Sequence, residues 1–199
     1  DERSVLLREV YHRVKNNLQV VDSIIALQSS GRNKAPPEQI LNDVRQRIYA
    51  LGLVHQQLMT SNDLKTFDIR PFFDELRQNL LASSGQRQGV TITVEADALT
   101  VDLDFAIPLG LLVTELVSNS LKHGFPEGRG GDIRVLLRHC LDDSLFLAVS
   151  DNGNAATSQI ATPGWRGGLG LRIVEALTDQ LEGEMKMFEP EGVGMGGTS

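Results

Sequence analysis

The chain has 199 residues, of which 41% are hydrophobic, so it can form one large domain or two small ones with a real core. A formal net charge of -7 disfavours nucleic-acid binding, and no apolar run approaches the roughly 20 residues that a membrane helix needs. The single Cys140 excludes an internal disulfide and has no companion ligands for a zinc site. We expect a cytoplasmic, globular fragment without a secretion signal or membrane contact of its own.

The first 62 residues predict two helices. Apolar residues recur three and four positions apart from Ser4 to Ser30 and again from Glu38 to Thr60, as on one face of a helix. Gly31 to Pro37 interrupts this pattern, which predicts an antiparallel helical hairpin. Because two helices leave much of their apolar stripes uncovered, we expect two copies to pair as a homodimer with a four-helix bundle.

Residues 63–199 predict a second domain with both helices and strands, which makes the whole chain α+β. A polar linker, Ser61–Lys65, precedes it. The expected elements are a helix capped by Asp68 that ends in Ser83–Gly89, a strand at Val90–Ala96, a long helix capped by Asp102 or Asp104 that runs to about Gly124, strands at Ile133–Cys140 and Ser144–Val149, a polar stretch at Asn152–Gly167, a helix from Gly168 to about Leu181 and a strand at Glu184–Glu189.

The predicted first helix carries a histidine on its polar side. His12 is two residues from both Val10 and Val14, which places it about 200° round the helix from each of these apolar positions. Asn16 and Gln19 continue the same polar stripe. An exposed, neutral imidazole is a competent nucleophile near pH 7, although a histidine on a polar helix face is more often simply solvated.

The long helix carries three polar residues spaced four apart, which therefore share one face: Glu115, Asn119 and His123. A carboxylate and an amide that project together can hold Mg²⁺, with waters and phosphates completing the octahedron. Lys122 adds a positive charge suited to a phosphate. The alternative is a helix with an ordinary polar face.

Two further motifs point towards a nucleotide. Asp151-Asn152-Gly153 ends a predicted strand, where a carboxylate can accept a hydrogen bond from the amine of adenine; alone, it is a common turn. Gly167-Gly168-Leu169-Gly170-Leu171 opens a predicted helix, where backbone N–H groups can approach phosphate. The glycine spacing matches neither the Rossmann fingerprint nor a P-loop.

These motifs occur in an order that resembles a known family. "EVYHRVKNNLQVV", "ELVSNSLKHGF", "VSDNG" and "GGLGLRIVEAL" resemble the sensor histidine kinases of the HisKA_2 type, which are related to the HWE kinases. The resemblance covers nearly the whole chain. It implies a dimeric phosphotransfer hairpin at residues 1–62, followed at residues 63–199 by an α/β-sandwich ATP-binding domain of the Bergerat (GHKL) type whose last strand is truncated.

The resemblance also implies roles for single residues. His12 matches the phosphoacceptor, Asn119 the Mg²⁺ ligand with Glu115 nearby, and Asp151 the adenine-binding aspartate. The remaining matches are Gly153, which leaves room for the ring, Gly168 and Gly170, which flank Leu169 at the end of the lid over the phosphates, and Thr198 in the last nucleotide motif. The implied reaction is ATP-dependent phosphorylation of His12, followed by transfer to an aspartate on a response regulator receiver domain.

The chain departs from the family pattern in places. Ala155 replaces the second glycine of a DxGxG motif, and Arg13 follows the histidine where many histidine kinases have an acid. Glu9 is therefore only a candidate base, and Asn16 a candidate for positioning water in a phosphatase reaction. Three alternatives stay open: an ATP-independent phosphotransferase or scaffold, a phosphatase-biased kinase with a degenerate ATP site, and a protein-serine kinase of the anti-sigma type. The serine kinase is disfavoured because it needs no hairpin bearing His12.

Overall fold

The computed structural model describes residues 36–83, 89–125, 130–142, 144–153 and 169–186. Their elements are α2 (Pro37–Thr60), β1 (Thr66–Asp68), α3 (Ile69–Ser83), β2 (Val90–Ala96), β3 (Thr100–Asp102), α4 (Leu103–Asn119), the π-helix η1 (Ser120–Gly124), β4 (Gly131–His139), β5 (Leu145–Asp151) and α5 (Leu169–Gln180). The predicted first helix with His12 lies outside these residues.

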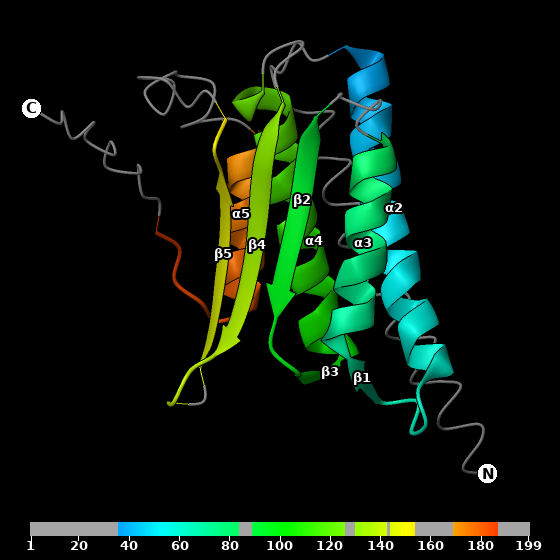
Figure 1. Ribbon diagram of the computed structural model, residues 1–199. Coiled ribbons are helices and arrows are strands. Elements are labelled where there is room, and N and C mark those ends of the chain that lie inside the picture. The colour runs from blue at the N-terminus through cyan, green and yellow to red at the C-terminus, as the bar shows by residue number, and fades with distance from the viewer. Residues whose placement is uncertain (1–35, 84–88, 126–129, 143, 154–168, 187–199) are drawn as a thin grey trace, which may run out of the picture.

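The main sheet has the strand order β2-β4-β5, and helices cover one of its faces (Figure 1). β2 runs parallel to β4, and β5 runs antiparallel to it, with Val135 opposite Val149. Because side chains alternate between the faces of a strand, Ile92, Ile133 and Val135 all point into the core, where they are buried. The expected α+β class is confirmed.

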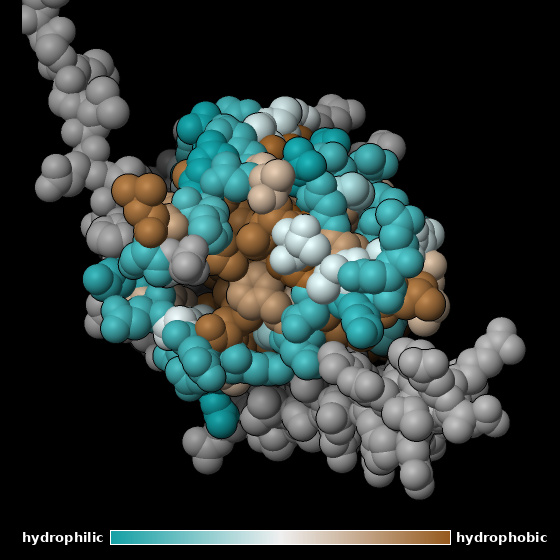
Figure 2. All heavy atoms as spheres, turned by 90° about the horizontal axis from the view of Figure 1, so that it is seen from below, coloured by the Kyte–Doolittle hydropathy of each residue, from teal (hydrophilic) through white to brown (hydrophobic). Residues whose placement is uncertain are grey.

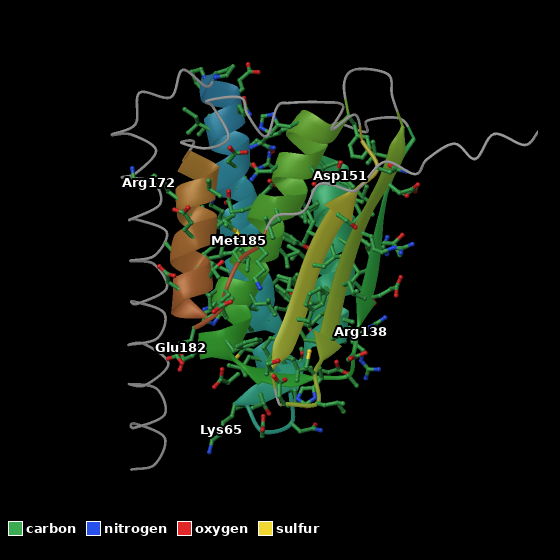
Figure 3. All side chains as sticks on the ribbon, turned by 90° about the vertical axis from the view of Figure 1, so that its left-hand side faces the viewer. Lys65, Arg138, Asp151, Arg172, Glu182 and Met185 are labelled. Carbon is green, nitrogen blue, oxygen red and sulfur yellow. The ribbon has the colours of Figure 1, made fainter. Side chains whose placement is uncertain are left out.

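α4 is the central helix of the fold. It lies between the sheet on one side and α2 and α5 on the other (Figure 3). This position explains why its sequence has so little polar face: most of its residues from Leu103 to Ser118 are buried. Leu103–Gly124 is long and apolar enough to cross a membrane by length and composition, but 72% of the apolar window is buried inside the fold, as in the core helix of a globular domain.

α2 confirms the predicted second helix and packs against α3 and α4. Ala50, Val54 and Leu58 are buried in this contact. Leu41 and Ile48, on another side of the same helix, remain exposed. The apolar stripe expected to face a hairpin partner is therefore divided between a buried side, which faces the second domain, and an exposed side.

The structure corrects the sequence-based elements at two places. β1 and β3 form a small antiparallel sheet, with Phe67 opposite Val101, that was not predicted because three-residue strands are too short to show alternation. The predicted strand Glu184–Glu189 is wrong at its described residues, since 184–186 belong to no strand. A strand needs a neighbouring strand whose backbone completes its hydrogen bonds, and the alternation of residues in a sequence does not show whether such a neighbour is present.

The predicted caps are confirmed. Asp102 accepts a hydrogen bond from the Phe105 N–H at 3.0 Å, and Asp68 accepts one from the Arg70 N–H at 3.0 Å. β1 and β3 lie at the lower end of the molecule in Figure 1. Viewed from this end, a polar rim surrounds a hollow in which apolar side chains are visible (Figure 2). The candidate site lies at the opposite end.

Candidate functional site

The helix changes its winding directly after Asn119, the middle one of the three predicted polar residues. Asn119 is the last residue of α4, and Ser120–Gly124 continues it as one turn of π-helix. Such turns are rare in proteins, and those that occur often lie at functional sites. Here the turn directs the side chains of Asn119 and Ser120 towards two different neighbours, α5 and β5.

Asn119 lies beside the first turn of α5. A Cβ atom placed on Gly170 would lie 3.4 Å from Nδ2 and 3.5 Å from Oδ1 of Asn119. The structure thus brings together two predicted site residues that are 51 positions apart. The positive end of the α5 dipole, with backbone N–H groups that lack helical partners, favours an anion at this point. An amide oxygen next to such a helix start is suited to a metal–phosphate group.

Asp151 ends β5 at the upper end of the sheet (Figure 3). Its Oδ2 accepts a hydrogen bond from the hydroxyl of Ser120 at 2.7 Å, and its Oδ1 accepts one from the backbone N–H of Gly153 at 3.1 Å. These two donors fix the plane of the carboxylate. Ser120 was missed in the sequence, because no spacing rule links it to a residue 31 positions away.

Gly153 lies directly against the backbone of Gly124. A Cβ atom there would collide with the carbonyl group of Gly124, so a glycine is needed for β5 to end this close to η1. The space expected for an adenine ring is, on this side, occupied by the Gly124 backbone. A Cβ atom on Gly124 would in turn lie 3.0 Å from Oδ1 of Asp151. The two glycines therefore allow the π-helical turn to approach the carboxylate.

Asn152 connects the same strand end to β4. Its side-chain oxygen accepts a hydrogen bond from the Asp132 N–H at 2.6 Å, and its Nδ2 donates to Oδ2 of Asp132 at 3.1 Å. Thr91 on β2 donates to the other oxygen of Asp132. This network extends over all three strands and holds Asp151 in position from the sheet side.

Glu115 and Lys122 face α2. Glu115 forms a buried ion pair with Arg47, and the Lys122 ammonium donates to Oδ1 of Asp43 at 2.6 Å. The predicted shared face of Glu115, Asn119 and His123 is therefore divided: Glu115 contacts α2, Asn119 lies beside Gly170, and His123 is exposed. The contacts with α2 were not predicted, because hydrophobic periodicity locates a helix face but not its partner.

The structure describes only one of the remaining predicted site residues. Leu169 is the first residue of α5. The others lie outside the described residues: Glu9, His12, Asn16, Gly168 and Thr198. Their roles stay predictions.

The described residues contain no group of three or more His, Cys, Asp or Glu side chains that could hold a metal ion. A site that relies on one protein oxygen, from Asn119, fits Mg²⁺ better than a metal that needs a full protein cage. Mg²⁺ keeps several waters and takes further oxygens from phosphates. The residues present are therefore compatible with Mg²⁺ carried by a nucleotide.

Comparison with known proteins decides the family. The model named HisKA_2, described as histidine kinase, matches residues 9–84. The model named HATPase_c, described as histidine kinase-, DNA gyrase B-, and HSP90-like ATPase, matches residues 104–198. The chain belongs to the histidine kinases. The second match covers α4, η1 and α5, so the site at Asn119 and Asp151 lies within an ATPase-type domain, and ATP binding is implied.

Individual relatives agree. The chain is 28% identical to blue-light-activated histidine kinase 2 of Erythrobacter litoralis over 91% of this chain and 52% of the relative, and 27% identical to the sensor histidine kinase PdtaS of Mycobacterium tuberculosis over 93% and 37%. The solved structure of the E. litoralis EL346 blue-light activated histidine kinase superposes with a TM-score of 0.68 at 27% identity, covering 92% of this chain and 58% of that one. The chain thus spans about a third to a half of the curated relatives named here.

Proposed function

We propose that this histidine kinase chain is the catalytic core of a cytoplasmic two-component sensor: it transfers the γ-phosphoryl group of ATP to His12 and then to an aspartate of a response regulator receiver domain. The observation that carries the proposal is the arrangement around one helical turn. Asn119 lies so close to the start of α5 that a Cβ atom placed on Gly170 would be 3.4 Å from its Nδ2, and the hydroxyl of the next residue, Ser120, donates a hydrogen bond to Asp151 at 2.7 Å. These residues offer a phosphate end and an adenine end.

Each end has the chemistry its ligand needs. The Asp151 carboxylate accepts a hydrogen bond from the exocyclic amine of adenine, while Ser120 and Gly153 keep it oriented. Asn119 would hold Mg²⁺, which neutralises charge on the phosphates when bound. Backbone N–H groups at Leu169 and Gly170 add donors for phosphate oxygens, and Gly168 precedes them in the sequence.

Phosphoryl transfer then depends mainly on placement. A ring nitrogen of His12 attacks the γ-phosphorus, the bond between this phosphorus and the oxygen bridging to the β-phosphate breaks, and ADP leaves. His12 loses its N–H proton to solvent or to a base, for which Glu9 is the candidate. Asn16, one turn beyond His12, would position water for the opposing phosphatase reaction. We further propose that residues 1–62 dimerise and that 63–199, with Thr198 in the last nucleotide motif, bind ATP.

One observation favours a second candidate, an ATP-independent phosphotransferase or scaffold. Glu115 and Lys122, which were predicted to serve the nucleotide, both have partners on α2, and Ala155 replaces a glycine of the family pattern. In this case His12 would receive its phosphoryl group from another protein, and the ATP domain would serve only as a docking unit.

Incubation of the chain with γ-labelled ATP and Mg²⁺ distinguishes the candidates. We expect an acid-labile, base-stable label that is absent in His12→Gln and in Asn119→Ala. Nucleotide binding without any label, in the presence of a functional receiver domain, contradicts the kinase and favours the relay. An acid-stable label that persists in His12→Gln indicates a serine kinase instead.

A further inference from the structure

The contact between α2 and α4 is polar at one end and apolar at the other. The two helices run antiparallel, so that Asp43 meets Lys122, Gln46 meets Ser118 and Arg47 meets Glu115. From Ala50 onwards the buried residues of α2 are apolar. The polar end of α2 therefore lies beside the end of α4 that carries the candidate nucleotide site.

The two ion pairs of this contact differ in their exposure to water. The side chains of Arg47 and Glu115 are only 4% and 9% exposed, and Nη1 of Arg47 has no partner among the described residues. Separating this pair would leave two buried charges, so it stays closed. The Lys122 and Asp43 side chains are 24% and 17% exposed, so water screens this pair and stabilises both groups when they part. Only the more exposed pair, Lys122–Asp43, is therefore suited to exchanging one partner for another.

We propose that Asp43 competes with the phosphates of a bound nucleoside triphosphate for the Lys122 ammonium. This inference rests on the proposed function, and it also takes up the sequence-based prediction that Lys122 is a phosphate ligand. The triphosphate carries more negative charge than one carboxylate, and it repels Asp43 once both are close to the same cation. Binding of the triphosphate therefore releases the first turns of α2, while the Arg47–Glu115 pair and the apolar half keep the helix attached.

The competition has a consequence for the reaction. α2 follows, in the chain, the segment that carries His12. A helix start that loosens when the triphosphate binds would make the attachment of the first turns of α2 depend on whether a phosphoryl donor is present. By linkage, the two effects are equal: the factor by which the bound triphosphate weakens docking of the helix start is also the factor by which the docked helix start weakens triphosphate binding.

The test is a binding measurement on the 199-residue chain. We expect Asp43→Asn to bind Mg²⁺–AMP-PNP about two- to five-fold more tightly than the unchanged protein, the range set by a partly exposed ion pair. Binding of adenosine, which has no phosphates, should not change. In a Lys122→Gln background, Asp43→Asn should not change the affinity for AMP-PNP any further. Because both proteins in this comparison carry Lys122→Gln, the comparison also corrects for any loss of folding that Lys122→Gln causes by itself.

Glu38→Gln is the matched control, because it removes the same charge from an exposed position in the first turn of α2. If it tightens AMP-PNP as much as Asp43→Asn, the effect is general electrostatics and the competition is overturned. Equal AMP-PNP affinity of Asp43→Asn and the unchanged protein also overturns it, while leaving the nucleotide site intact. If the unchanged protein binds neither AMP-PNP nor adenosine, the proposed function itself fails, and the competition with it.

Discussion

Ser120 donates its hydroxyl hydrogen bond to Asp151 at 2.7 Å, across 31 residues of sequence. This contact joins the π-helical turn after α4 to the end of β5, and so connects the part of the site proposed to bind phosphate with the part proposed to bind adenine. Gly124 and Gly153 make it possible, because any side chain at either position would push the turn and the strand apart.

The first prediction concerns this pair. Asp151→Asn should weaken adenosine binding by about ten-fold or more, since hydrogen bonds to charged groups contribute about 1.5–3 kcal/mol. Ser120→Ala should weaken it less, because the carboxylate remains and loses only one of its two orienting donors. Equilibrium dialysis or calorimetry with adenosine measures both. Ser150→Ala, on the neighbouring residue of β5, is the control and should bind as the unchanged protein does.

The buried ion pair leads to a second prediction. Arg47→Met leaves the Glu115 carboxylate buried without its partner and should lower the free energy of unfolding by about 3–5 kcal/mol. The double variant Arg47→Met, Glu115→Leu should recover most of this loss, because two apolar side chains of similar size replace two charges. Urea denaturation measures both. A double variant as unstable as the single one would show that the pair contributes more than mutual neutralisation.

The third prediction concerns packing between α3 and α4. A Cβ atom on Gly110 would lie 2.6 Å from Cζ of Phe72, whose side chain is fully buried. Gly110→Ala should therefore destabilise the protein by about 1–3 kcal/mol, although alanine is the better helix former. The measurement is the urea midpoint. Gly110→Ala should be milder in a Phe72→Leu background, because the smaller side chain leaves room for the methyl group.

Burial lowers the pKa of His55, on α2, below its ordinary value of 6.5. Between the lowered folded value and 6.5, the unfolded chain binds a proton that the folded chain does not. The contribution of His55 to stability is therefore greatest above about pH 6.5 and declines as the pH falls below it. Urea unfolding at a series of pH values should show a smaller decline in His55→Gln. Equal declines in both proteins would contradict the prediction.

Much of the fold followed from local patterns. Val90–Ala96 was predicted with its observed bounds, because one face of β2 is buried and the other is wet, which imposes alternation. The helix now seen as α2 was predicted within a residue at its start, because Pro36 and Pro37 precede its apolar repeat. β1 and β3 could not be found, since three residues hold too little periodicity.

The candidate site divides in the same way. Asn119, Asp151 and Gly170 were predicted because each belongs to a motif whose residue types have a chemical meaning in themselves. Ser120 was not, because an ordinary serine acquires a role only from what the chain brings near it. The same holds for Asp43 and Arg47, which are unremarkable members of a helix until α4 is placed against them.

The sequence by itself determined which residues can attack, coordinate or accept a hydrogen bond, and which faces of the helices and strands are apolar. These properties are local, set by side-chain chemistry and by the repeat of each element. Only the tertiary structure decided that α2 packs on α4 and that a π-helical turn places Asn119 and Ser120 between α5 and β5. The physical reason is that an apolar side chain is stabilised by almost any apolar surface that excludes water. A polar group needs a specific partner at hydrogen-bonding distance, and the distances between elements are not encoded in any local pattern.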